Sequence, residues 1–240
     1  MLIIHNFIVF EGGDGSGTST QIDLLKKHFL SRNSESGESG GAAGGLAAGN
    51  AGDTAGVWGL PPLHTTFEPT DGPIGRLIRS ALRGDISLEA ETIARLFAAD
   101  RNEHLSGKNG IPERCRRGEL VVSDRYTPSS LVYQGIECGE ALPKLLNGTF
   151  PGPELLLYFD LDSETALERI KTRPSRDIYE RLEFQRKVRN AYKSILSWYA
   201  GEGVRVRIID ASRAPKEVAE EVWSAVQELP IMRNRERPGE

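Results

Sequence analysis

A glycine-rich stretch near the N-terminus has the spacing of a phosphate-binding loop. Residues 11–21 read EGGDGSGTSTQ, so four residues separate Gly12 from Gly17 and a hydroxyl residue, Ser19, follows. Glycines allow backbone angles that direct several N–H groups at one anion, and the start of a helix adds its positive dipole end. We expect a nucleotide phosphate to bind this run, although an ordinary glycine-rich turn is the alternative. The candidate residues are Gly12, Gly13, Asp14, Gly15, Ser16, Gly17, Thr18, Ser19 and Thr20.

One residue departs from the phosphate-loop pattern. The motif has Lys after the second glycine, where it places a positive charge on the β- and γ-phosphates, and this chain has Thr18. Lys26 and Lys27 lie about two turns further along the expected helix and are too far away to reach back. A cation from elsewhere in the chain would have to substitute.

A second polar pair follows an apolar run at residues 120–123. Asp124 stands at the end of this predicted strand, where a carboxylate beside a phosphate loop suits Mg²⁺, with Ser19 as a second oxygen ligand. The planar guanidinium of Arg125 suits bidentate contact with a phosphate. The alternative is that Asp124 and Arg125 form a surface ion pair.

The elements that must position these residues alternate along the chain. Apolar runs predict strands at 3–10, 63–67, 120–123, 155–160 and 204–210, and amphipathic patterns predict helices at 19–30, 88–105, 163–171, 182–199 and 215–229. Near-continuously apolar strands separated by helices predict an α/β fold with a parallel sheet of about five strands, covered on both faces. Ligands of such sheets bind beyond the carboxyl ends of the strands, where the glycine loop and Asp124 are expected.

Two segments fall outside this pattern. Residues 33–56 contain 8 Gly, 6 Ala and 3 Ser, with Leu46 as the one large apolar residue, so they bury too little surface to offset their ordering entropy. We expect a flexible insertion there, within a single domain that spans 1–230, followed by a polar tail at 231–240.

Composition excludes several classes of protein. Lys and Arg number 30 against 34 Asp and Glu, and a net charge of −4 argues against non-specific binding of nucleic acid. No apolar run approaches the ~20 residues of a membrane span, and the apolar N-terminus lacks the basic flank of a signal peptide. Cys115 and Cys138 are too few for a disulfide framework, so we expect reduced thiols in a cytoplasmic protein.

Several ordered motifs resemble those of one enzyme family. Residues 124–134, DRYTPSSLVYQ, look like the signature of the thymidylate (dTMP) kinases, nucleoside monophosphate kinases of the phosphate-loop class. Further similar stretches are FEG at 10–12, TFEP at 66–69 with PIG at 73–75, LFAADR at 96–101, and the regions 153–160, 166–169 and 184–192. Apart from the insertion and the tail, the resemblance covers nearly all of the chain.

The resemblance implies a phosphate-loop NTPase fold with a short lid and ATP-dependent phosphorylation of dTMP to dTDP, a step of dTTP biosynthesis, with Mg²⁺. It implies that Phe97 stacks on thymine, that Arg101 hydrogen-bonds the base edge and that Tyr133 crowds the sugar 2′ position. The implied dTMP site comprises Glu68, Phe97, Arg101, Arg125, Ser130, Tyr133 and Gln134. Without the family, Phe97 could be a core position, Arg101 a solvated helix charge and Tyr133 a half-buried aromatic.

The resemblance also implies the residues that act on the transferring group. Arg125 would bind the acceptor phosphate, Asp14 would hold the acceptor side or a metal-bound water, and Arg173 and Arg176 fall where the family has its lid arginines. Without the family resemblance, the run of charged residues around Arg173 would be interpreted as a solvent-exposed surface. Family members are usually homodimers, so a homodimer is implied.

Departures from the family leave two alternatives. Phe67 stands where bacterial members usually have Arg, and Thr70 and Asp71 stand where they have Gly-Gly. Together with Thr18, these changes remove positive charge from the phosphate region. The chain could therefore be a nucleotide-binding homologue with impaired catalysis, or a kinase for another nucleoside monophosphate.

Overall fold

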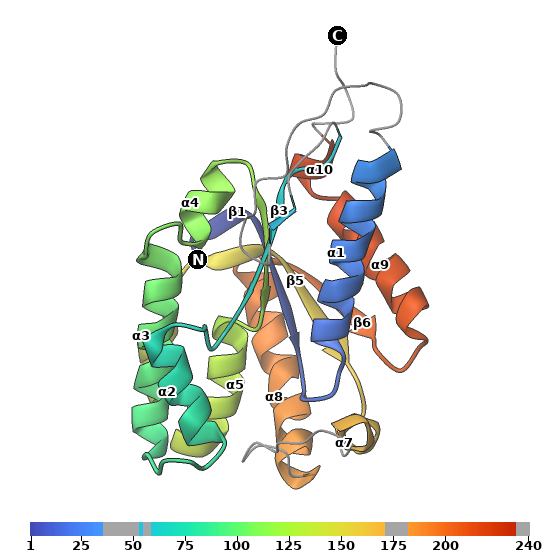
Figure 1. The fold of residues 1–240 in the computed structure, drawn as a ribbon. Helices are drawn as coiled ribbons and strands as arrows, with labels where there is room; N and C mark the ends of the chain where they lie inside the picture. The colour runs from blue at the N-terminus through green and yellow to red at the C-terminus, as the bar shows by residue number, and fades with distance from the viewer. Residues whose placement is uncertain (36–52, 55–58, 171–181, 234–240) are drawn as a thin grey trace.

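One six-stranded sheet forms the centre of the computed structural model, which describes residues 1–35, 53–54, 59–170 and 182–233 (Figure 1). The strand order is β2-β3-β4-β1-β5-β6, and β2 alone runs antiparallel, against β3. The strands are β1 (Ile3–Gly12), β2 (Asp53–Thr54), β3 (Leu63–Phe67), β4 (Leu120–Asp124), β5 (Gly152–Asp160) and β6 (Arg205–Asp210). The predicted parallel sheet of five strands is confirmed, with β2 added at one edge.

The central strands are apolar because both of their faces are covered. The side chains of β1 from Phe7 to Phe10 are buried, and β5 is buried along its whole length except for Asp160. Residues of β1 alternate between the two faces, so Ile8 and Phe10 belong to one apolar cluster and Phe7 and Val9 to another. Such continuous burial is typical of parallel sheets.

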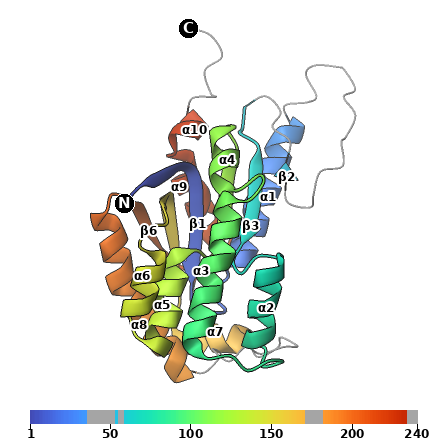
Figure 2. The ribbon, with the colours of Figure 1, turned by 90° about the vertical axis from the view of Figure 1, so that its left-hand side faces the viewer.

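Helices cover both faces of the sheet (Figures 1 and 2). One face packs against α1 and α9, whose apolar side chains share a cluster with Ile8, Phe10 and Leu157. The other face packs against α2, α3, α5 and α8. The helices are α1 (Thr18–Glu35), α2 (Pro73–Leu82), α3 (Ala90–Ser106), α4 (Ile111–Arg116), α5 (Thr127–Cys138), α6 (Ala141–Asn147), α7 (Ser163–Ile170), α8 (Leu182–Gly201), α9 (Pro215–Gln227) and α10 (Pro230–Arg233).

The boundaries of two predicted segments change. Helix α1 continues to Glu35 and β2 takes Asp53–Thr54, so both ends of the predicted 33–56 insertion contain regular structure; 36–52 and 55–58 lie outside the described residues. The predicted tail at 231–240 begins within α10, where Met232 is buried, because the apolar pair Ile231 and Met232 packs on the core. Within the described ranges, no helix combines the length and apolar character that crossing a bilayer requires.

Register brings the polar strand ends together. In the ladder, Phe10 pairs with Asp124, Phe67 also pairs with Asp124, and Gly12 pairs with Phe159. The loop after β1 and the residues after β3, β4 and β5 therefore meet at one edge of the sheet, at the end of the molecule where Figure 1 places α7. This is the edge where parallel sheets bind ligands.

Candidate active site

The glycine loop connects β1 to α1 in a conformation that requires glycine. Gly15 and Gly17 have φ angles of 89° and 94°, a region that residues with a side chain rarely adopt. A Cβ atom on Gly15 would also collide with the backbone oxygen of Ala166. Ser16 N–H donates to the carbonyl of Gly13 at 3.1 Å, and Thr18 begins the helix. The predicted strand–loop–helix arrangement is therefore present.

Ser19 and Asp124 lie together at this edge. The Ser19 hydroxyl donates to Asp124 Oδ2 at 2.7 Å, from the first turn of α1 to the end of β4. Asp124 Oδ1 and the Ser16 hydroxyl are buried and have no hydrogen-bond partner within the described ranges. Hard oxygen donors of this kind fit Mg²⁺, which takes a few protein ligands together with water and phosphate oxygens. The described residues hold no group of three or more His, Cys, Asp or Glu side chains suited to a metal.

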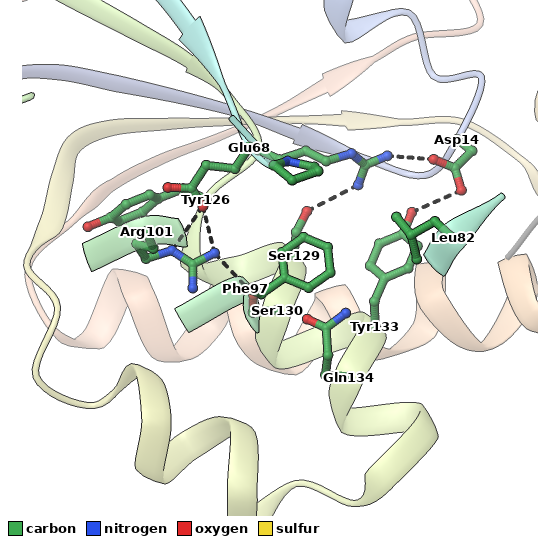
Figure 3. Close-up of a pocket in the computed structure, with 12 residues that line it drawn as sticks. Asp14, Glu68, Leu82, Phe97, Arg101, Tyr126, Ser129, Ser130, Tyr133 and Gln134 are labelled. Carbon is green, nitrogen blue, oxygen red and sulfur yellow. Dashed lines mark hydrogen bonds and ion pairs between the residues drawn. The ribbon is translucent and has the colours of Figure 1, made fainter. Parts of the chain in front are cut away.

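A pocket of about 110 Å³ opens beside the loop, between β3, α3 and α5 (Figure 3). All of the side chains that the family resemblance assigned to dTMP line it, together with Asp14. Phe97 faces this cavity, and Arg101 and Tyr133 are buried, so the solvated or half-exposed alternatives for those two are wrong. The other lining residues, to which the resemblance assigned no role, are Leu82, Pro69 of the TFEP stretch, and Tyr126 and Ser129 of the DRYTPSSLVYQ stretch.

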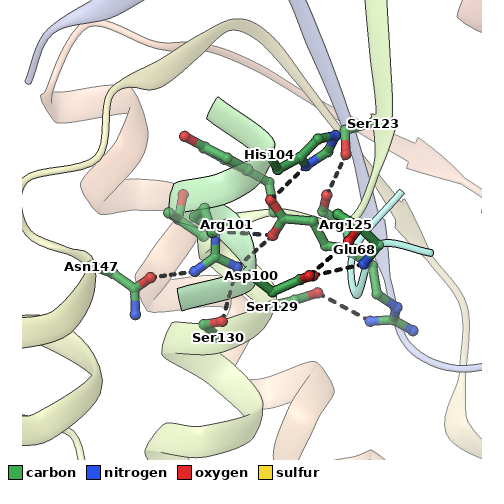
Figure 4. Close-up of polar contacts among 12 residues, drawn as sticks. Glu68, Asp100, Arg101, His104, Ser123, Arg125, Ser129, Ser130 and Asn147 are labelled. Carbon is green, nitrogen blue, oxygen red and sulfur yellow. Dashed lines mark hydrogen bonds and ion pairs between the residues drawn. The ribbon is translucent and has the colours of Figure 1, made fainter. Parts of the chain in front are cut away.

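A buried ion pair holds one wall of the pocket (Figure 4). Arg101 is 1% exposed and donates from Nε and Nη2 to Glu68 Oε2 at 2.9 and 2.6 Å. Its remaining polar contacts are with Asn147 and with the Ser130 hydroxyl, 3.0 Å from Nη2. Glu68 also contacts His104, with 3.1 Å between Oε1 and Nδ1. Because its partners fix the guanidinium, Arg101 presents a rigid edge to the pocket.

Arg125 forms the opposite end of the pocket. Its Nη2 donates to Asp14 Oδ1 at 2.6 Å and its Nη1 to the Ser129 hydroxyl at 3.1 Å. The guanidinium carbon lies 5.1 Å from the centre of the Tyr133 ring. Arg125 thus pairs with Asp14 and Asp124 accepts from Ser19, so the alternative of a surface pair between Asp124 and Arg125 is wrong.

The carboxylate of Asp14 accepts hydrogen bonds from three separate parts of the chain. Besides Arg125, the Gln185 amide donates to Oδ2 at 2.8 Å and the Tyr133 hydroxyl lies 3.4 Å from the same oxygen. Burial raises the pKa of the Tyr133 phenol, so this hydroxyl keeps its proton at neutral pH. Gln134 lies at the same pocket, and its amide oxygen is buried with no hydrogen-bond partner in the described part of the chain. A ligand N–H group would satisfy that oxygen.

Three of the residues that depart from the family, Phe67, Thr70 and Asp71, flank the pocket residues Glu68 and Pro69 in the sequence. Phe67 is 42% exposed at the end of β3, with the Arg79 guanidinium 5.9 Å from its ring centre. Arg79 also pairs with Asp71 at 2.8 Å, and Thr70 bonds through its N–H and hydroxyl to Asp100, at 2.7 Å each. Arg173 and Arg176, the predicted lid arginines, lie outside the described residues.

Sequence reasoning missed several polar residues that hold the site together. Glu11, Gln185 and His104 each contact a side chain of the pocket or of the loop. Glu11 directly follows the predicted first strand and lies within the FEG stretch, and that placement was its one visible signal. The partners of Gln185 and His104 are distant in sequence, so no local pattern identified them.

Comparison with known proteins decides the family. The family model for thymidylate kinase matches residues 59–222. The chain belongs to the thymidylate kinase family. A putative thymidylate kinase of Treponema pallidum (strain Nichols) is 39% identical over 196 residues, 81% of each chain. A probable thymidylate kinase of Pyrobaculum aerophilum is 39% identical over 225 residues, covering 93% of this chain and 97% of that one.

A third thymidylate kinase relative extends this pattern. The putative thymidylate kinase of Aeropyrum pernix is 34% identical over 229 residues, covering 91% of this chain and 96% of the relative. Since the three relatives match 81–93% of this chain, the likeness extends beyond the residues that the family model matches. The resemblance found in the sequence is therefore confirmed.

Proposed function

We propose that this thymidylate kinase family member transfers the γ-phosphoryl group of Mg-ATP to dTMP, giving ADP and dTDP for dTTP synthesis. The observation that carries this is the pocket, where every side chain assigned to dTMP converges beside a phosphate loop. An oxygen of the dTMP phosphate attacks the γ-phosphorus of ATP. The bond from that phosphorus to the oxygen that joins it to the β-phosphorus breaks, and ADP leaves with that oxygen. The attacking oxygen is already anionic at neutral pH, so catalysis is mainly positioning and charge neutralisation.

The described side chains divide between the two substrates. Phe97 offers a flat apolar surface for the base, Arg101 and Gln134 offer polar atoms for its edge, and Arg125 offers its guanidinium to the acceptor phosphate. The loop from Gly12 to Thr20 presents backbone N–H groups to the phosphates of ATP. Ser19 and Asp124 would hold Mg²⁺, which neutralises charge on the β- and γ-phosphates when bound.

The experiment that tests this function is a coupled ADP-release assay with Mg-ATP and dTMP. It is run on the native protein and on Thr18→Lys, and we expect native turnover on the order of 1 s⁻¹ or more. That result means that Thr18 is tolerated and other cations neutralise the phosphates. A silent native protein with an active Thr18→Lys variant would contradict the proposal, as would turnover of dUMP or a ribonucleotide in strong preference to dTMP.

The assembly and the location follow as smaller proposals. We propose a homodimer, supported by membership of the thymidylate kinase family, and sedimentation velocity tests it. We also propose that the protein acts in the cytoplasm, which suits Cys115 and Cys138, both free thiols.

A further inference from the structure

The backbone of Arg125 is held in an unfavourable conformation. Its φ angle is 70°, in the left-handed region that few residues other than glycine adopt, so the surrounding structure must maintain it. Arg125 N–H donates to the carbonyl of Phe10 at 2.9 Å, and the Ser123 hydroxyl donates to the Arg125 carbonyl at 2.8 Å (Figure 4). The next N–H, that of Tyr126, donates to Glu11 Oε1 at 2.8 Å.

Glu11 is a fully buried carboxylate in the strand that leads into the glycine loop. It is 0% exposed, and the donors around it come from α5 and α8 as well as from Tyr126. The Ser129 hydroxyl and the Tyr192 hydroxyl lie 2.6 and 2.8 Å from Oε2, and the Ser129 N–H lies 3.2 Å from Oε1. Burial raises the pKa of the Glu11 carboxyl, and the Arg125 charge and the hydrogen bonds from Ser129, Tyr192 and Tyr126 oppose that rise because they stabilise the ionised form.

The Ser129 hydroxyl connects this carboxylate to the guanidinium. Arg125 Nη1 donates to Ser129 Oγ at 3.1 Å, and Ser129 Oγ donates onward to Glu11 Oε2. Glu11 therefore acts on Arg125 at two points: through the backbone of Tyr126 and through the side chain of Ser129. A charged acceptor strengthens each hydrogen bond of such a chain.

We propose that Glu11 is the positioning residue that fixes Arg125 in its strained backbone conformation and directs its guanidinium at the acceptor phosphate. This rests on the proposed function for the identity of the ligand. Glu11 is not among the residues that line the pocket. Its role is distinct from general support of the glycine loop, although it directly precedes Gly12, because its four contacts lead to Tyr126, α5 and α8 and none leads to the loop.

The test compares the two substrates of the full-length protein by titration calorimetry. Glu11→Gln keeps the size of the side chain and removes its charge. We expect the Kd for dTMP to rise about tenfold, equivalent to about 1.4 kcal/mol, and the Kd for ATP to stay within about twofold. Loosening of the strand and loop would weaken ATP as much as dTMP, and equal losses would overturn the inference.

Two further variants keep the test decisive. Ser129→Ala breaks the chain from Arg125 and keeps the Glu11 carboxylate, which loses one of its donors. We expect this variant also to weaken dTMP more than ATP, even if Glu11→Gln does not fold. Glu154→Gln is the matched control: Glu154 is a buried strand carboxylate that accepts the Asn6 N–H at 2.7 Å, and its loss should leave both Kd values unchanged. Weaker dTMP binding in Glu154→Gln, or selective loss of ATP in Ser129→Ala, would refute the inference.

The outcome also separates this inference from the proposed function. If the native protein binds dTMP but forms no dTDP, and Glu11→Gln still weakens dTMP alone, the kinase proposal fails and the inference stands. If the native protein turns dTMP over and Glu11→Gln affects both substrates equally, the inference fails alone. A native protein that does not bind dTMP would overturn both.

Discussion

The pair formed by Glu68 and Arg101 is the most heavily buried ion pair of the pocket, and Glu68→Gln tests its contribution to stability. The two side chains are 2% and 1% exposed, so the substitution leaves a guanidinium in a site with almost no water. Removal of one partner of a buried pair costs about 3–5 kcal/mol, since the remaining charge is uncompensated. Gln keeps one acceptor for Arg101, and Asn147 and Ser130 keep their contacts, so we expect about 3 kcal/mol.

Urea unfolding monitored by circular dichroism measures this loss. With an m-value of about 3 kcal/mol/M, the midpoint should fall by about 1 M at unchanged slope. Glu91→Gln is the matched control on α3, because Glu91 forms an exposed pair with Arg95 at 3.1 Å, and such pairs contribute about 0.3–0.5 kcal/mol. A Glu68→Gln midpoint equal to that of the native protein would refute the reasoning. Arg101→Met added to Glu68→Gln should recover part of the loss, since no charge then remains buried.

Two further predictions concern the metal and the thiols. Asp124→Asn should raise the Mg²⁺ concentration needed for half-maximal dTDP formation by about tenfold, because it removes the negative charge of a carboxylate ligand that lies beside Ser19. An unchanged Mg²⁺ dependence would contradict the assignment of Asp124 as a Mg²⁺ ligand. Burial and the nearby carboxylates of Glu119 and Glu154 raise the pKa of Cys115 to about 12, so only about 10⁻⁴ of it is thiolate at pH 8. Labelling of Cys115 by iodoacetamide, followed by mass spectrometry, should be very slow in the native protein and rise about tenfold per pH unit between pH 7 and 9; rapid labelling at pH 8 would show that the site is open.

The sheet was predictable from the sequence because its strands are buried on both faces. Phe7 to Phe10 and Leu155 to Phe159 read as continuous apolar runs, and the glycine spacing marked the turn that follows the first of them. Helix α5 was not predicted as a helix, for a physical reason. Its buried side chains include Thr127, Ser130 and Gln134, so the inward face mixes polar and apolar residues and shows no clean helical period.

The sequence predicted which residues form the site, but not which of them form hydrogen bonds and ion pairs with one another. Family resemblance identified Glu68, Arg101 and Arg125, yet a single sequence did not show that Arg101 pairs with Glu68, which lies 33 residues away. Glu11 presents the same difficulty more sharply, because its partner Tyr192 is 181 residues distant. A charged residue inside an apolar strand indicates a buried partner, but the sequence does not name it.

The charges of the pocket explain why cations beyond it matter. The charged side chains that line it are Asp14, Glu68, Arg101 and Arg125, two acids and two bases, and each base is already paired with one of the acids. A monophosphate would bring further negative charge, and a bound nucleoside triphosphate more again. Arg125 can turn its guanidinium partly from Asp14 to a phosphate, because Gln185 and Tyr133 also donate to that carboxylate. The Arg101 pair is too buried to offer a comparable exchange, so Mg²⁺ and the arginines at 173 and 176 are the cations that we expect to replace the lysine missing at Thr18.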